Sequence, residues 1–151
     1  MSQNPRVIRD GRSLGHRAFH AYKLDEDGTG NYFETSQSKT TAPTLLLNTA
    51  VVPPKVKSGI INRIHYRLNP TNAETYTLRI WRGAAAANLQ SNLYMLYESD
   101  PLRADDTDYD VAELAIPFNL NDEGLLYYSI EWTGASGNTT GFIEVSGEMF
   151  F

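Results

Sequence analysis

Apolar residues recur at every second position through most of the chain from residue 59 onward, which is the spacing of β-strands and not of helices. In the run 75–83, Tyr76, Leu78 and Ile80 fall on one face. The run 125–132 repeats the pattern with Leu126, Tyr128, Ile130 and Trp132. Both runs are therefore predicted to be strands that bury one face.

Five more strands and one helical turn are also predicted. The inner positions are Ile60, Ile64, Tyr66 and Leu68 in the run 59–69, and Ile143 and Val145 in the last run. The other face of the run 59–69 carries Arg63, His65 and Arg67. The run 111–120 has Pro117 on the opposite phase, which favours an edge strand or a bulge. The runs 44–52 and 92–99 are apolar on both faces, which predicts buried strands. Only 83–90 has helix propensity, for one or two turns.

Glycine-, proline- and asparagine-rich turns separate these runs, as in antiparallel proteins. Short strands at this spacing predict an all-β fold, an antiparallel two-sheet sandwich. The jelly-roll type fits best, although chain order leaves an immunoglobulin-like sandwich open. Residues 1–42 are polar and contain little to bury, so they are predicted to form an extended N-terminal arm with one or two short strands. Residues 43–151 are predicted to form the sandwich domain.

Charge is also unevenly distributed along the chain. Residues 1–24 hold five basic residues against one acidic residue, whereas the other 127 residues hold eight basic and 17 acidic ones. The basic side chains proposed for partner binding are Arg6, Arg9, Arg12 and Arg17. A basic arm ahead of an acidic body is suited to an acidic protein surface. Four net charges, widely spaced, do not favour nucleic acid.

The composition also excludes several kinds of site and segment. The chain has no cysteine, which excludes disulfides, thiolate metal sites and cysteine nucleophiles. Its first residues lack the apolar region of a secretion signal, and no apolar run reaches the length of a membrane span. We therefore expect a protein that is made in the cytoplasm and has no membrane segment.

Residues 98–110 place six carboxylates in 13 positions. Asp106, Asp108 and Asp110 have the D-x-D-x-D spacing with which a calcium loop begins, and calcium takes six to eight oxygen ligands. The glycine and the final glutamate of an EF-hand are missing, so the alternative is a solvated connection between strands. Apart from this possible Ca²⁺, no cofactor is expected.

Other candidate chemistry finds less support. His16 and His20 lie four residues apart, but Arg17 stands between them where a zinc hydrolase has its catalytic glutamate. Glu131 and Glu144 lie on two strands joined by a glycine-rich turn and could form a glycosidase-like carboxylate pair if those strands were neighbours. The simpler interpretation is that both are exposed surface residues.

Aromatic residues suggest a binding platform. Trp81 has the phase opposite to Leu78 and Ile80, so it is predicted to point outward, where Tyr94 and Tyr97 could extend its surface. Such a platform fits a sugar ring or a protein partner, although aromatic side chains in a sandwich mostly fill its core.

The segment GLLYYSIEWTGASGNTTGFIEVSGEMFF, together with the basic arm and the cysteine-free body, resembles small β-sandwich virion proteins of tailed bacteriophages, especially capsid decoration or cement proteins. This resemblance implies a non-enzymatic protein of the virion, made in the host cytoplasm. It would sit on the outer capsid surface, often as a homotrimer, and clamp neighbouring capsid subunits. The alternative is a carbohydrate- or receptor-binding sandwich of a tail or fibre, and a hydrolase is third.

Overall fold

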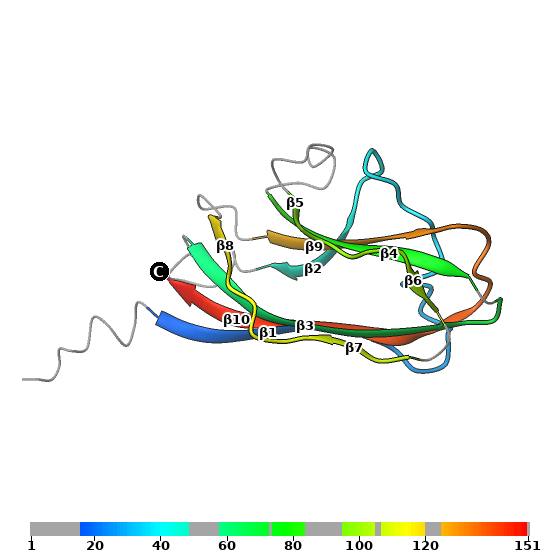
Figure 1. The fold of residues 1–151 in the computed structure, drawn as a ribbon, viewed down its shortest axis with the longest axis horizontal. Coiled ribbons are helices and arrows are strands. Elements are labelled where there is room, and N and C mark those ends of the chain that lie inside the picture. The colour runs from blue at the N-terminus through cyan, green and yellow to red at the C-terminus, as the bar shows by residue number, and fades with distance from the viewer. Residues whose placement is uncertain are drawn as a thin grey trace, which may run out of the picture.

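The protein is a sandwich of two antiparallel β-sheets (Figure 1). The computed structural model describes residues 16–48, 58–72, 74–83, 95–104, 107–119 and 125–150. These residues form ten strands and no helix, and the two sheets pack face to face around one core. The predicted all-β, two-sheet sandwich is confirmed.

Each sheet interleaves strands from distant parts of the chain. The first sheet has the order β1-β10-β3-β7, with β8 also paired to β3, and the second has the order β2-β9-β4-β5, with β6 also paired to β4. The first sheet contains β1 (His16–Asp25), β3 (Ser58–Pro70), β7 (Tyr109–Val111), β8 (Ile116–Asn119) and β10 (Thr139–Phe150). The second contains β2 (Thr44–Asn48), β4 (Thr75–Gly83), β5 (Met95–Glu98), β6 (Leu102–Arg103) and β9 (Leu125–Trp132).

The region expected to be an arm contributes a long strand to the sandwich. All ten residues of β1 pair with β10, from His16 opposite Phe150 to Asp25 opposite Gly141. Phe33 lies in the core at 1% exposure, and Gln37 donates its backbone N–H to the carbonyl oxygen of Ile130. Residues 16–37 are therefore held by the sandwich.

Alternation along β4, β9 and β10 places the predicted inner residues in the core. Leu78, Ile80, Tyr128, Ile143 and Val145 each have no exposed surface. Removal of this much apolar side-chain surface from water provides the main driving force for packing the two sheets.

The predicted inner face of β3 is wrong at one end. Ile61, and not Ile60, is fully buried, whereas Ile64 keeps its predicted inward position. The register against β10 shifts between Ser146 and Gly147, so that Asn62 is an extra residue in β3. A bulge of this kind reverses which face the following side chains occupy.

Two other runs also differ from their predictions. The run 111–120 is divided into β7 and β8, which both pair with β3, and Pro117 lies on β8 as an exposed edge residue. β2 is an edge strand whose Leu45 is 42% exposed, so the prediction of a buried strand there is wrong. The expected helical turn falls in 84–90, outside the described residues. Within the part of the chain that the structure describes, no helix has the length and apolar character needed to span a membrane.

Candidate functional site

Charged side chains from four strands meet on the outer face of the first sheet. Alternation in β3 turns Arg63, His65 and Arg67 away from the core, and pairing with β7 brings the acidic loop alongside them. We call the set of His20, Arg63, His65, Arg67, Asp108, Asp110 and Glu144 the charge network. The period of two thus places opposite charges from two neighbouring strands on one surface.

The best-formed pair in the network joins Arg63 to Asp110. Nε of Arg63 donates to Oδ1 of Asp110 at 2.7 Å, and Nη2 donates to Oδ2 at 2.6 Å. Two parallel hydrogen bonds fix the orientation of the Arg63 guanidinium relative to the Asp110 carboxylate better than one contact would. The hydrogen bonds from Arg63 lower the pKa of Asp110 and those to Asp110 raise the pKa of Arg63.

The remaining contacts extend the network across the sheet. Asp108 lies 3.4 Å from Nη1 of Arg67 and 3.9 Å from Nε2 of His65. Nδ1 of His65 is 3.4 Å from Glu144 of β10, whose other oxygen is 3.9 Å from His20 of β1. Since these side chains are partly or largely exposed, each pair contributes little to stability alone.

Asp108 and Asp110 therefore face cationic side chains, and Asp106 lies outside the described residues. No group of three or more His, Cys, Asp or Glu residues suited to a metal ion occurs among the residues that the structure describes. The calcium site at Asp106, Asp108 and Asp110 stays a prediction, and the geometry favours a role of the loop in pairing with β3.

The Asp110→Asn variant should lose part of the protein's acid sensitivity. A carboxylate whose pKa is lowered in the folded state stabilises that state above its unfolded value of about 3.9, and this stabilisation disappears as pH falls through the lower folded value. Denaturant unfolding at a series of pH values should therefore show a shallower loss of stability below about pH 4 in the variant. Arg63→Gln should have the same effect. Acid slopes equal to wild type in both variants would contradict the pairing.

Apolar and aromatic groups lie beside the network on the same face. Phe142 packs edge-on against His65 with ring centroids 4.9 Å apart, and the guanidinium of Arg67 lies 5.3 Å from the Phe142 centroid. On β1, Tyr22 and Leu24 are 58% and 46% exposed. The face therefore presents both paired charges and exposed aromatic and apolar side chains, and aromatic residues and arginine are enriched at protein interfaces.

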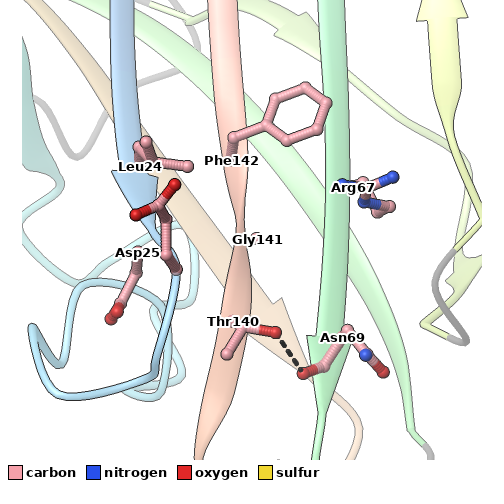
Figure 2. Close-up of a pocket in the computed structure, with 8 residues that line it drawn as sticks. Leu24, Asp25, Arg67, Asn69, Thr140, Gly141 and Phe142 are labelled. Atoms are coloured by element: carbon pink, nitrogen blue, oxygen red, sulfur yellow. Dashed lines mark hydrogen bonds between the residues drawn. The ribbon is translucent and has the colours of Figure 1, made fainter.

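A pocket of about 230 Å³ opens at one end of this face (Figure 2). Figure 2 shows Gly141 between Leu24 of β1 and Arg67 of β3. The hydroxyl of Thr140 donates to the carbonyl oxygen of Asn69 at 3.5 Å. Gly141 has φ +145°, and a Cβ there would overlap the carbonyl oxygen of Arg67, so glycine is required. The volume is below the range of typical small-molecule sites, about 300–1,000 Å³.

The predicted platform at Trp81 is wrong. Trp81 does lie on the outer face of the second sheet, but it is only 1% exposed, and its Nε1 donates to the buried hydroxyl of Ser129 at 2.9 Å. Tyr97 is half-buried, with its hydroxyl 3.4 Å from that of Tyr66, and Tyr94 lies outside the described residues. An indole that is already covered cannot stack on a sugar.

The outer face of the second sheet also contains a buried cationic side chain, Arg79. The side chain of Arg79 is 7% exposed and donates to Glu98 and to Glu131, each at 2.7 Å. Burial alone would disfavour its charge, but the two carboxylates outweigh burial and raise the pKa of Arg79. Glu131 therefore pairs with Arg79 within the second sheet, whereas Glu144 lies on the first sheet. The proposed carboxylate pair is not formed, because the turn after β9 crosses from one sheet to the other.

The predicted basic anchors are only partly placed. Arg17 lies in β1, opposite Met149. Arg6, Arg9 and Arg12 lie outside the described residues. Their role in binding a partner stays a prediction.

The sequence interpretation missed the pairing of β3 with the acidic loop, although a signal was present. Arg63, His65 and Arg67 alternate with apolar residues, as Asp108 and Asp110 do in their own run. Two runs of opposite charge with the same period of two are typical of neighbouring strands. Tyr22 and Leu24 gave no comparable signal, because their exposure depends on the edge position of β1 in the sheet.

No protein-family model matches the chain. No curated protein matches it either. Similar solved structures include a chain of the cyanophage Pam1 capsid asymmetric unit, at 14% identity and a TM-score of 0.41, over 91% of this chain and 87% of that one. A tomato aspermy virus chain has 12% identity and a TM-score of 0.36, over 88% and 77%. A Clostridium thermocellum xylanase 10B chain with CBM22-1 and GH10 modules has 11% identity and a TM-score of 0.35, over 91% and 26%. At these values none of the three assigns a family or a function.

Proposed function

We propose that this chain is a non-enzymatic structural protein of a virion, a decoration or cement protein that binds the outer capsid surface and stabilises contacts between subunits. The observation that carries the proposal is the outer face of the first sheet, where exposed Tyr22 and Leu24 lie beside the charge network. A broad sheet surface with paired charges suits contact with another protein, since the charges select the partner and the apolar groups supply affinity.

The sequence-level resemblance to phage decoration proteins supports the same role. The interleaved order of both sheets is compatible with the two Greek keys of a jelly-roll, an architecture found in viral capsid domains and also in lectins. The acidic body would face outward, and the basic residues that precede β1 would reach an acidic capsid surface, paying their ordering entropy through the contacts made there.

Removal of residues 1–15 should abolish attachment to capsids while leaving the fold intact. The deletion spares β1, whereas a deletion to residue 24 would remove a strand that pairs along its whole length with β10. Co-sedimentation with virus particles from the natural source measures attachment, and thermal unfolding measures the fold. We expect at least a tenfold loss of bound protein, about 1.4 kcal/mol or more in binding free energy.

A charge-matched variant sharpens this test. Changing Arg6, Arg9 and Arg12 together to lysine keeps the charge and should retain most binding, whereas changing them to glutamine should lose it. Undiminished attachment of both the deletion and the glutamine variant would overturn the role of these residues. Loss of attachment on substitution of Tyr22 and Leu24, with the deletion and the glutamine variant unaffected, would place the capsid contact on the outer face alone.

The carbohydrate- or receptor-binding alternative has lost its predicted platform at Trp81. Sugar binding by the wild-type protein that is lost on Tyr22→Ala would support this alternative over the capsid role.

A further inference from the structure

The connection after β1 holds a buried carboxylate with one unpartnered oxygen. Asp25, the last residue of β1, is 4% exposed. Its Oδ1 accepts the backbone N–H of Gly28 at 2.8 Å, whereas its buried Oδ2 has no hydrogen-bond donor among the described residues. Oδ2 also faces the loop, 3.1 Å from the position that a Cβ would take at Gly30. A buried carboxylate oxygen without a donor is costly, so a ligand that brings positive charge into this loop would be favoured.

A second carboxylate lies beside the first. Asp27 is exposed, and its Oδ1 accepts the backbone N–H of Thr29 at 3.0 Å and the Thr29 hydroxyl at 2.6 Å. These hydrogen bonds lower the pKa of Asp27, and a contact with the side chain of Asp25 acts in the same direction. Two carboxylates in contact need a shared proton or a cation between them, because two negative charges at this distance repel each other.

No basic side chain in the described part of the chain neutralises this pair. The ion pairs there involve other carboxylates, those of Glu98, Asp108, Asp110, Glu131 and Glu144. The basic residue nearest to Asp25 in sequence, Lys23, has its Nζ 4.8 Å from the centroid of the Tyr32 ring. The loop 25–31 therefore lacks the cationic partners that the carboxylates of the charge network have.

We propose that the loop 25–31 binds a calcium ion through the carboxylates of Asp25 and Asp27. Calcium takes six to eight oxygen ligands in flexible geometry, so carboxylates on alternate residues of a loop can share one ion. Asp25, Asp27, Thr29 and Gly30 also stand at the first, third, fifth and sixth positions of the EF-hand calcium loop. The other ligands would be hydroxyl, backbone carbonyl and water oxygens.

The composition of this site predicts weak binding. The twelfth position of an EF-hand loop is a bidentate glutamate, but here it is Ser36, whose hydroxyl accepts the backbone N–H of Trp132 at 2.9 Å. Among the described residues no three His, Cys, Asp or Glu side chains form a metal-binding group, so two carboxylates supply the charge. Since affinity rises with the number of charged ligands, we expect a Kd on the order of 10⁻⁴ to 10⁻³ M.

An ion in this loop would stabilise one end of the sandwich. The connection that contains it lies against the turn after β9: the hydroxyl of Ser136 donates to the carbonyl oxygen of Glu34 at 3.4 Å, and a Cβ at Gly28 would lie 2.3 Å from the side-chain nitrogen of Asn138. Oε2 of Glu34 is the other described carboxylate oxygen that is buried without a donor. Calcium bound to the folded loop alone should therefore raise the melting temperature.

Calcium titration of the purified full-length protein tests the site. We expect saturable binding of one ion by calorimetry and, at about 10 mM CaCl₂, a melting temperature higher by about 3–10 °C. Excess chelator should reverse this rise. MgCl₂ at equal ionic strength should have a smaller effect, because Mg²⁺ requires near-ideal octahedral geometry. Absence of binding, or an equal rise with MgCl₂, would overturn the proposal.

Asp27→Asn locates the ion. Its side chain is exposed, so the fold should persist, and calcium binding should weaken by at least about tenfold, the lower end of the cost of losing even a group that only orients a ligand. Asp108→Asn is the matched control, an exposed carboxylate of the other acidic loop, and it should bind calcium as wild type does. The opposite result would place the ion at residues 106–110 and refute the site at Asp25.

Nuclear magnetic resonance of the wild-type protein gives the same answer without a variant. Calcium should shift the amide signals of residues 26–31, including those of Gly28 and Gly30, more than the signals of residues 107–111. Larger shifts in the second group would contradict the proposal, even if Asp27→Asn failed to fold.

A shared proton is the competing way to hold Asp25 and Asp27 together. A melting temperature that ignores calcium but rises as the pH falls from about 7 to about 5 would assign the pair to a proton and overturn the calcium site. These measurements use no virus particles, so failure of calcium binding leaves the proposed capsid role untouched. Failure of capsid attachment likewise leaves the calcium site standing.

Discussion

Replacement of Trp81 with alanine should lower the free energy of unfolding by about 3–5 kcal/mol, the usual range for a buried tryptophan. The indole is 1% exposed on the outer face of the second sheet, so its removal leaves a cavity next to β9. It also leaves the hydroxyl of Ser129, which has no exposed surface, without its donor. Urea unfolding followed by circular dichroism measures the loss.

Trp81→Phe separates the two contributions. Phenylalanine keeps most of the ring but has no N–H group, so it should cost about 1 kcal/mol for the lost hydrogen bond, plus a smaller packing term. If Trp81→Ala were as stable as wild type, the indole would be exposed in solution, and a sugar platform at this position would again be reasonable. A large loss of stability means that reduced ligand binding by this variant reflects unfolding.

The inner faces of the strands were predictable because alternation reports which side of a strand is more apolar. Leu78 and Ile130 are buried as expected on this ground alone. Alternation fails where one residue is added, as at Asn62, because a bulge has no sequence signature in β3 and shifts Ile61 into the position expected for Ile60.

The outer faces were less predictable. Alternation shows that Trp81 and Arg79 lie opposite to the core, but it does not show whether that face meets water. Both are buried. Arg79 can be buried because Glu98 and Glu131 lie on the two neighbouring strands, a fact that depends on sheet order.

The charge network was predictable in its parts and not in its assembly. Arg63 and Asp110 are 47 positions apart, and only the pairing of β3 with β7 brings them together. From the sequence alone, the loop at residues 98–110 is compatible with either a calcium site or a solvated connection. In the structure, two of its carboxylates contact β3.

Gly147→Ala should lower the free energy of unfolding by about 3 kcal/mol, at the upper end of the usual cost of overpacking. Gly147 is buried in β10 where the register against β3 shifts, and a Cβ there would overlap the carbonyl oxygen of Ile60. That oxygen belongs to the backbone and cannot rotate away as a side chain can. The two strands must therefore separate locally, which weakens pairing in the middle of the first sheet.

Gly134→Ala is the matched control. Gly134 is exposed in the turn after β9, and its added Cβ would meet Oε1 of Glu74 at 2.6 Å, the mobile end of a flexible side chain. This carboxylate can move at little cost, so the change in stability should stay within about 0.5 kcal/mol. Both variants remove one glycine from the unfolded chain and thus gain similarly in chain entropy. A difference of less than about 1 kcal/mol between them would show that β10 does not approach β3 closely at Gly147. A larger difference in the free energy of unfolding would show that the stability of the first sheet depends on the close contact at the bulge, where Ile61 turns into the core.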